Sequence, residues 1–205
     1  MIDAEKHYHE RMQVFANETV EPGGIVFLGS SHLEWFDTDK FLPGHRIVNR
    51  GIASDRLGIG DRGILHRLDV SVFDCRPSFI LFQNGINDLG ELARQGEPSL
   101  DEIFECYEQV VAAIRRRLPH VPVCIVNELP TTGRFACCVP FVPPLNAHIR
   151  HVAQTYGCLH VDFYRDVVND DGELRSELTY DGLHLNEQGY RLLADRLKHV
   201  LPTVS

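Results

Sequence analysis

The chain has 205 residues, 43% of them hydrophobic and 24% charged, so its composition is ordinary for a globular protein and its length suits one domain, residues 1–205. Its net charge of −9 is unfavourable for a nucleic-acid partner or an anionic membrane surface. No apolar stretch approaches the ~18 residues that span a bilayer, and no secretory signal is visible, so we expect a cytoplasmic protein without stable membrane insertion. The six cysteines contain no C-x-x-C pair, so we expect reduced thiols and no metal. No cofactor is expected.

The predicted elements alternate between helices and strands along the chain. Helical spacing of Tyr8, Met12 and Phe15 predicts a first helix, and the "EPGG" that follows ends it. Apolar runs of the kind that are buried on both faces predict five strands, at residues 25–29, 46–49, 78–83, 122–127 and 158–163. Helices are predicted over residues 4–17, 100–117, 145–156 and 186–201.

This alternation predicts an α/β fold with a parallel, doubly wound, five-stranded sheet and helices on both faces. In open parallel sheets, ligands bind outside the carboxyl ends of the strands. The segments that follow the five predicted strands are therefore the places to look for a site. Four of them are rich in reactive or polar residues: "GSSH", "RGIASD", "NGINDLG" and the segment that contains "TYDGLH".

A candidate nucleophile follows the first strand, as Ser30 or Ser31 of "GSSH". A nucleophilic serine needs a base, an acid that orients the base, and donors for the oxyanion. Asp181 and His184 lie three residues apart just before the last predicted helix. An acid at that spacing can hold one imidazole nitrogen while the other nitrogen accepts the serine proton.

Oxyanion donors are expected from the second and third segments. Asn87 follows the third strand, where its side-chain amide can donate to a developing oxyanion. The backbone N–H groups of "RGIASD" follow the second strand and can point into the same cleft. Taken singly, each signal also fits a turn or a helix cap. Their joint placement, each after the required strand, favours a serine hydrolase.

The segments resemble the motif blocks of the SGNH hydrolases, also called GDSL-type esterases and lipases, over about residues 25–200. The family's first block is usually Gly-Asp-Ser, and aligning the glycines places its nucleophile at Ser31 and its aspartate at Ser30. The "GIND" of residues 85–88 matches Gly-x-Asn-Asp, and the "DGLH" of residues 181–184 matches Asp-x-x-His.

The resemblance implies a flavodoxin-like three-layer α/β/α sandwich. It implies that Ser31 is the nucleophile, His184 the base and Asp181 its partner, with Ser31, Ser54 and Asn87 forming the oxyanion hole. The second block, "NRGIASD", departs from the family pattern of roughly Asn-x-Gly-Ile-x-Gly-Asp, because Ser54 stands where the family has its oxyanion glycine. Serine supplies the same backbone N–H, but it is strained there if the position requires a positive φ.

The expected activity is that of a serine esterase or acylhydrolase. It would cleave a small ester, with a short acyl chain, through an acyl-enzyme intermediate, so the expected partner is a small-molecule ester. A thioesterase and a carbohydrate O-deacetylase remain alternatives on the same site. A non-catalytic binding protein on the same fold is a further alternative, supported only by the serines at positions 30 and 54.

Other residues near the motifs each fit two roles. His32, Gly85 and Arg134 are candidates for lining the cleft, although His32 also fits a helix cap and Arg134 a solvated loop. Trp35 and Phe36 are expected in the core, with the wall of an acyl pocket as the alternative.

Two rival motifs are weak. The glycines of residues 58–63 match G-x-G-x-x-G, but a dinucleotide site requires them directly after the first strand, and they follow the second. His148, His151 and His160 make a metal site conceivable, and surface or strand-edge histidines are the commoner explanation.

Overall fold

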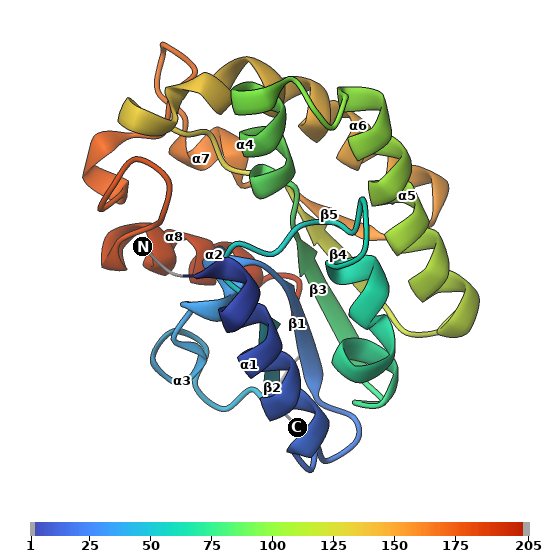
Figure 1. Cartoon of the computed structure of the whole chain (residues 1–205). Helices are drawn as coiled ribbons and strands as arrows, with labels where there is room; N and C mark the ends of the chain where they lie inside the picture. Colours follow the sequence, from blue (N-terminus) through green and yellow to red (C-terminus); the bar gives the residue numbers. More distant parts are fainter. Residues whose placement is uncertain (1–2, 203–205) are drawn as a thin grey trace.

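A sheet of five parallel strands forms the centre of the computed structural model, which describes residues 3–202 (Figure 1). The strand order across the sheet is β2-β1-β3-β4-β5. This arrangement confirms the predicted α/β fold with a parallel five-stranded sheet. The strands are β1 Ile25–Gly29, β2 Ile47–Gly51, β3 Phe79–Gln83, β4 Val123–Val126 and β5 Leu159–Val161.

Helices connect the strands and cover the sheet. They are α1 Ala4–Asn17, α2 Ser31–Glu34, α3 Thr38–Phe41, α4 Ile86–Gln95, α5 Leu100–Arg117, α6 Val142–Thr155, α7 Tyr164–Val167 and α8 Glu187–Leu197. Short 3₁₀ or π segments occur at Ile64–Arg67, Asp69–Phe73, Gly133–Phe141 and Ser176–Leu178. The predicted helices 4–17 and 100–117 have the observed bounds. The predicted helix 145–156 begins earlier, at Val142, because prolines are tolerated in a first helical turn.

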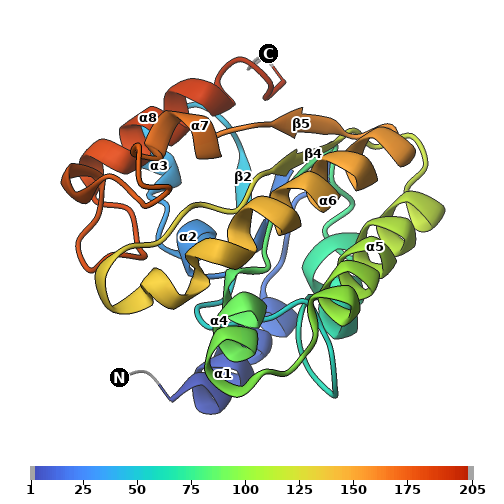
Figure 2. The same cartoon turned by 90° about the horizontal axis from the view of Figure 1, so that it is seen from above.

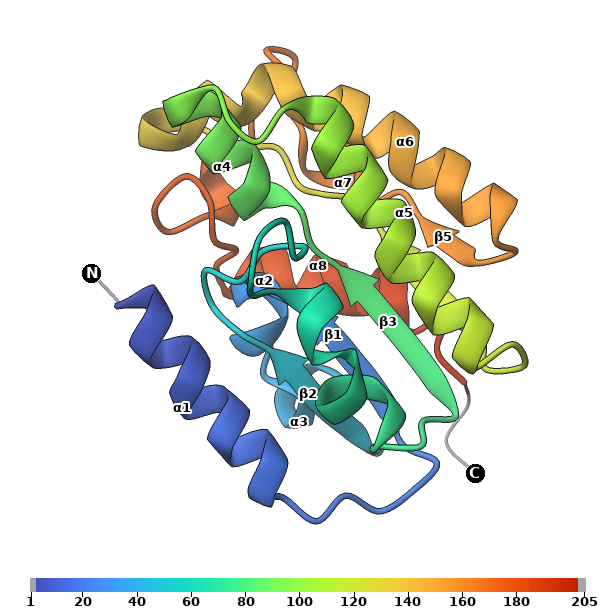
Figure 3. The same cartoon turned by 45° about the vertical axis from the view of Figure 1, so that its right-hand side comes forward.

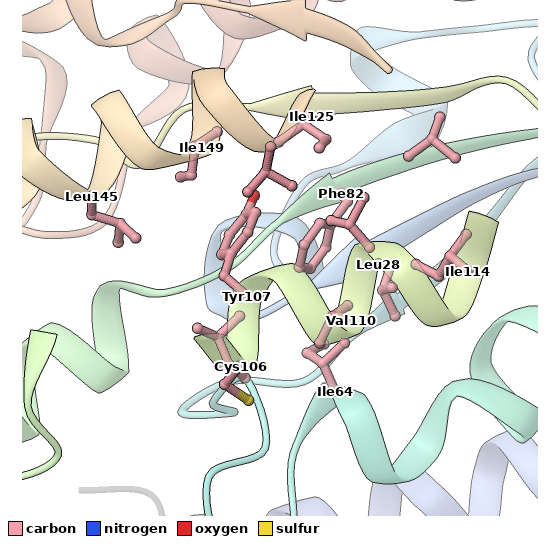
Figure 4. Close-up of a cluster of buried hydrophobic side chains, with 14 of the residues drawn as sticks. Leu28, Ile64, Phe82, Cys106, Tyr107, Val110, Ile114, Ile125, Leu145 and Ile149 are labelled. Atoms are coloured by element: carbon pink, nitrogen blue, oxygen red, sulfur yellow. The ribbon is translucent and has the colours of Figure 1, made fainter. Parts of the chain in front are cut away.

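Alternate side chains of each strand point to opposite faces of the sheet. On one face Leu28 of β1, Phe82 of β3 and Ile125 of β4 pack against α5 and α6, as Figure 4 shows. On the other face Phe27 and Leu81 pack with residues of α8, including Leu193. Viewed from above, the sheet lies between α4, α5 and α6 on one side and α3, α7 and α8 on the other (Figure 2). These are the three layers that the family resemblance implied.

Helix α1 lies beside β2 at the edge of the sheet (Figure 3). Its buried residues Tyr8 and Phe15 pack with Ile52, which directly follows β2. The N-terminal helix therefore contacts the segment that follows the second strand.

Candidate active site

The carboxyl ends of β1, β2 and β3 meet at one edge of the sheet. In the strand register Gly29 of β1 lies beside Gly51 of β2 and Gln83 of β3. The segments that follow these three strands therefore emerge side by side. The connection between β5 and α8 returns to the same edge and carries residues 181–184 to Ser31.

Ser31, His184 and Asp181 form a continuous hydrogen-bonded chain. The Ser31 Oγ lies 3.0 Å from His184 Nε2, across 153 positions of sequence. The His184 Nδ1 lies 3.0 Å from Asp181 Oδ2. A carboxylate only accepts, so Nδ1 carries the proton and Nε2 is free to accept from the serine hydroxyl. The structure thus brings together the three residues that the sequence indicated as nucleophile, base and acid.

The Asp181 carboxylate is oriented by its own turn. Its Oδ1 accepts the backbone N–H groups of Leu183 at 3.1 Å and His184 at 2.9 Å. The Thr179 hydroxyl accepts the Gly182 N–H at 3.0 Å and donates to the His184 carbonyl at 2.7 Å, which closes the turn. Partial burial opposes the charge on Asp181, but the hydrogen bonds from His184 and Leu183 outweigh it and lower the pKa of the carboxyl to about 2. Asp181 is therefore ionised at neutral pH.

The aromatic ring of Trp35 lies against the imidazole of His184. The Trp35 ring lies 4.3 Å from it, centroid to centroid, and 45% of Trp35 is exposed. The prediction that Trp35 belongs to the core is wrong, because its ring covers the imidazole rather than the sheet. Phe36, in contrast, is buried as predicted.

His32 lies behind the imidazole of His184. Its ring is buried and lies 5.9 Å from that of His184, and its Nε2 donates to the Leu183 carbonyl at 2.9 Å. Burial is the main cause that lowers the pKa of His32 to about 4, so the ring is neutral near pH 7. His32 thus ties the serine segment to the histidine turn and offers little surface to a cleft.

The three expected oxyanion donors lie on neighbouring segments. Ser31 is the first residue of α2, so its N–H has no acceptor within that helix. Asn87, in the first turn of α4, donates one amide hydrogen to the Asp55 carbonyl at 2.8 Å, which leaves the second hydrogen free. Ser54 is exposed and has a φ of +64°, within the left-handed region that glycine adopts readily. The position therefore does require a positive φ, as anticipated where serine replaces the family glycine.

Buried charges hold the segment around Ser54. Arg67 donates through Nε to the Asp55 carboxylate at 2.8 Å and through Nη2 to the Gly29 carbonyl at 3.1 Å. The Asp88 carboxylate accepts the Leu57 N–H, and burial raises the pKa of this carboxyl to about 7. Nothing in the sequence marked Arg67 for this role, since a single arginine in "LHRLD" has no distinctive pattern.

The other two cleft candidates differ in exposure. Gly85 is buried, with φ +139°, and a Cβ there would lie 2.9 Å from the Leu145 side chain, so the chain needs glycine to turn into α4. Arg134 is 70% exposed and its Nη2 lies 3.3 Å from Asp181 Oδ2. Arg134 is therefore a solvated residue beside the Asp181 carboxylate.

A buried glutamate was missed by sequence reasoning. Glu128 follows β4, and both its carboxyl oxygens are buried without a hydrogen-bond partner among the described residues. Burial, with the charge of Asp88 nearby, raises the pKa of Glu128 to about 8. The signal in the sequence was its place at the carboxyl end of a buried strand, in "NELP".

The rival motifs do not form sites. Gly58 and Gly63 belong to a loop after β2, where Gly58 accepts a hydrogen bond from His66. His148 stacks on Phe104 and bonds to its carbonyl at 3.0 Å. Across residues 3–202 no cluster of three or more His, Cys, Asp or Glu side chains is arranged to hold a metal ion. Nor does this part of the chain contain a helix long and apolar enough to cross a membrane.

Solved structures share this fold over nearly the whole chain. A Streptococcus pneumonia protein provisionally assigned as a platelet activating factor superposes with a TM-score of 0.80 at 25% identity, covering 96% of this chain and 92% of its own. A GDSL-like lipase from Bacteroides thetaiotaomicron has a TM-score of 0.79 at 19% identity, with 96% of each chain covered. A catalytic mutant of an acetylxylan esterase from Geobacillus stearothermophilus has a TM-score of 0.66 at 15% identity, covering 89% of this chain and 95% of its own.

Two sequence comparisons also match this chain, one with a curated protein and one with a family model. An N-acylneuraminate cytidylyltransferase from Escherichia coli O18:K1:H7 (strain RS218) is 22% identical over 202 residues, covering 98% of this chain but only 45% of that protein. This chain thus spans less than half of that relative. Residues 35–192 match the model of the GDSL-like Lipase/Acylhydrolase family, a segment that includes Ser54, Asn87, Asp181 and His184 and begins just after Ser31. Since well over half of its length matches, the chain belongs to the GDSL-like lipase/acylhydrolase family.

Proposed function

We propose that the protein is a serine esterase that cleaves a small ester with a short acyl chain through an acyl-enzyme intermediate. The observation that carries this proposal is the chain of two hydrogen bonds, each 3.0 Å, from Asp181 through His184 to the Ser31 hydroxyl. A nucleophile within hydrogen-bond reach of a base, which is oriented in turn by an acid, is the arrangement that activates serine.

In the first step, Ser31 Oγ attacks the ester carbonyl while His184 Nε2 takes the hydroxyl proton. The ionised Asp181 keeps the imidazole in the required tautomer and stabilises the imidazolium that forms. His184 then gives the proton to the departing alcohol, and the acyl group remains on Ser31. Water, deprotonated by His184, attacks the acyl-enzyme. The bond between the acyl carbon and Ser31 Oγ then breaks, the carboxylic acid leaves, and His184 returns the proton to Ser31 Oγ.

The negative oxygen of each tetrahedral intermediate would be bound by the N–H groups of Ser31 and Ser54 and by the Asn87 amide. Ser54 takes the place of a family glycine, but its backbone lies at φ +64°, so the N–H can point where a glycine N–H would. This is why we favour an active enzyme over the non-catalytic binding protein.

A sugar O-acetyl ester is the second candidate substrate class. Acetylxylan esterases are among the structures with this fold. Trp35 also favours this class, because its exposed ring lies against His184 and offers a flat apolar surface beside the nucleophile. The same surface suits a short acyl chain. Rates on p-nitrophenyl esters from acetyl to decanoyl, on an acetylated xyloside and on an acyl thioester would separate these alternatives.

Replacing Ser31 tests the proposal directly. In Ser31→Ala we expect kcat for p-nitrophenyl acetate to fall by about 10⁴–10⁶, because the nucleophile is lost while the fold remains. Ser30→Ala is the matched control, since Ser30 is an equally buried neighbouring serine. It should keep both activity and labelling by a fluorophosphonate probe, which Ser31→Ala should lose. Unchanged hydrolysis in Ser31→Ala, or no labelling of the folded parent protein, would refute the esterase.

A further inference from the structure

Glu34 joins the helix that carries Ser31 to the segment that carries Ser54. It is the last residue of α2, and its Oε2 accepts the N–H of Ala53 at 2.5 Å. The two backbones also touch: a Cβ added to Gly51 would lie 2.2 Å from the Glu34 nitrogen. The residue before Ser54 is therefore held by a side chain from the nucleophile's own helix.

The carboxylate of Glu34 is largely withdrawn from water and is paired with α1. Its side chain is 11% exposed. His7 Nε2 lies 3.0 Å from both carboxylate oxygens, and Arg11 Nε lies 3.2 Å from Oε1. Since a buried carboxylate without partners is costly, α1 supplies the hydrogen bonds and charge that keep Glu34 in place.

The segment needs such support because Ser54 has a positive φ. A non-glycine residue in this region persists only where its surroundings determine the conformation. On the far side of Ser54, Asp55 is held by Arg67 through its carboxylate and by Asn87 through its carbonyl. On the near side, Ala53 is held by Glu34. The direction of the Ser54 N–H thus depends on anchors at both of its neighbours.

We infer that Glu34 is a positioning residue, which sets the Ser54 N–H for the oxyanion by anchoring Ala53, and that α1 acts on the reaction through Glu34. This inference rests on the proposed esterase function. It assigns to Glu34 no contact with substrate.

Two conservative variants of Glu34 distinguish the effect of its side-chain length from the effect of its charge. Glu34→Asp keeps the charge but withdraws the carboxylate by about 1.5 Å, the length of one C–C bond, from the Ala53 N–H. Glu34→Gln keeps the reach and an accepting oxygen but removes the charge. We expect kcat for p-nitrophenyl acetate to fall about 10- to 100-fold in Glu34→Asp, with KM within about threefold, because an oxyanion donor acts chiefly in the transition state. In Glu34→Gln we expect kcat within about fivefold of the parent.

Glu18→Asp is the matched control. Glu18 Oε2 accepts from Arg50 Nη1 at 2.5 Å and so ties the end of α1 to β2, but it makes no hydrogen bond or ion pair with residues 51–55. Shortening it should leave kcat unchanged. If Glu34→Asp keeps the parent kcat, or if Glu34→Gln loses as much as Glu34→Asp, the positioning role is overturned.

A structural measurement keeps this test independent of catalysis. In backbone NMR spectra, Glu34→Asp should shift the amide signals of Ala53 and Ser54 and speed their hydrogen exchange, and Glu34→Gln should restore both. Unchanged signals in Glu34→Asp would overturn the inference even if the protein hydrolyses esters. A parent protein as inactive as Ser31→Ala would instead refute the proposed function, and the amide signals would still decide the role of Glu34.

Discussion

The left-handed backbone at Ser54 leads to a quantitative prediction for Ser54→Gly. A non-glycine residue in this region costs roughly 1–2 kcal/mol. Glycine removes that cost but loses roughly 0.5–1 kcal/mol more conformational entropy on folding. The central values of these two ranges differ by about 0.75 kcal/mol, so the variant should be more stable than the parent by about 0.5–1 kcal/mol. In a chain of 205 residues, this corresponds to a rise in Tm of about 1–4 °C, measurable by calorimetry.

Catalysis should be nearly unchanged in Ser54→Gly. The proposed role of Ser54 uses only its backbone N–H, which glycine also has, and the neighbouring residues Ala53 and Asp55 keep their anchors. We expect kcat and KM for p-nitrophenyl acetate to stay within about threefold of the parent. For comparison, the loss of one oxyanion donor lowers kcat by about 10²–10³.

Arg76→Gly is the control for the stability effect. Arg76 is the other non-glycine residue with a positive φ among residues 3–202, at +46°. It is exposed, and its carbonyl accepts the Gly23 N–H near the amino end of β1, away from the site. Arg76→Gly should raise Tm by a similar amount without affecting kcat. A lower Tm in Ser54→Gly alone would show that Ser54 is not strained, and a fall in kcat of more than tenfold would show that its side chain takes part.

Three further predictions concern the amide donor and the buried acids and bases. Asn87→Ala should lower kcat by about 10²–10³ with little change in KM, because the proposed oxyanion donor is the amide hydrogen that Asn87 does not donate to Asp55. Steady-state kinetics that show a loss confined to KM would contradict this role. The pKa values of about 2 for Asp181 and about 4 for His32 place both titrations below about pH 5. Any fall in kcat/KM on the acid side above about pH 5 should therefore come from neither group. A pH profile whose acid side shifts in His32→Gln would contradict this prediction. The pKa of Glu128 is raised from 4.5 to about 8, so between these pH values the folded state holds a proton that the unfolded state releases. The free energy of unfolding should therefore fall as the pH rises from 4.5 to 8, by at most about 5 kcal/mol from this group. Urea unfolding at pH 5 and pH 8 should show a smaller loss in Glu128→Gln than in the parent, and equal losses would mean that Glu128 does not hold that proton.

Local patterns in the chain predicted the main framework. Strand β1 and helices α1 and α5 have the predicted bounds, because an uninterrupted apolar run and a helical apolar stripe are strong local signals. The remaining predicted strands differ from the observed ones by at most two residues at either end. Helices α2, α3, α4 and α7 were not predicted. For α2, α3 and α7, of four residues each, the reason is that so short a helix is set by its neighbours and shows no periodicity.

The order and types of the groups at the site could be predicted from the chain, since a serine, an asparagine and an Asp-x-x-His turn each follow a strand or return to the same sheet edge. The departure of Ser54 from the family pattern was also visible there. Three features required the folded structure: the 3.0 Å between Ser31 and His184, the positive φ of Ser54, and the position of the Trp35 ring over the imidazole rather than in the core. They could not be predicted because they depend on contacts between residues far apart in the chain. Glu34 shows this most clearly, because its role depends on a backbone N–H of another segment, which a single residue's type does not reveal.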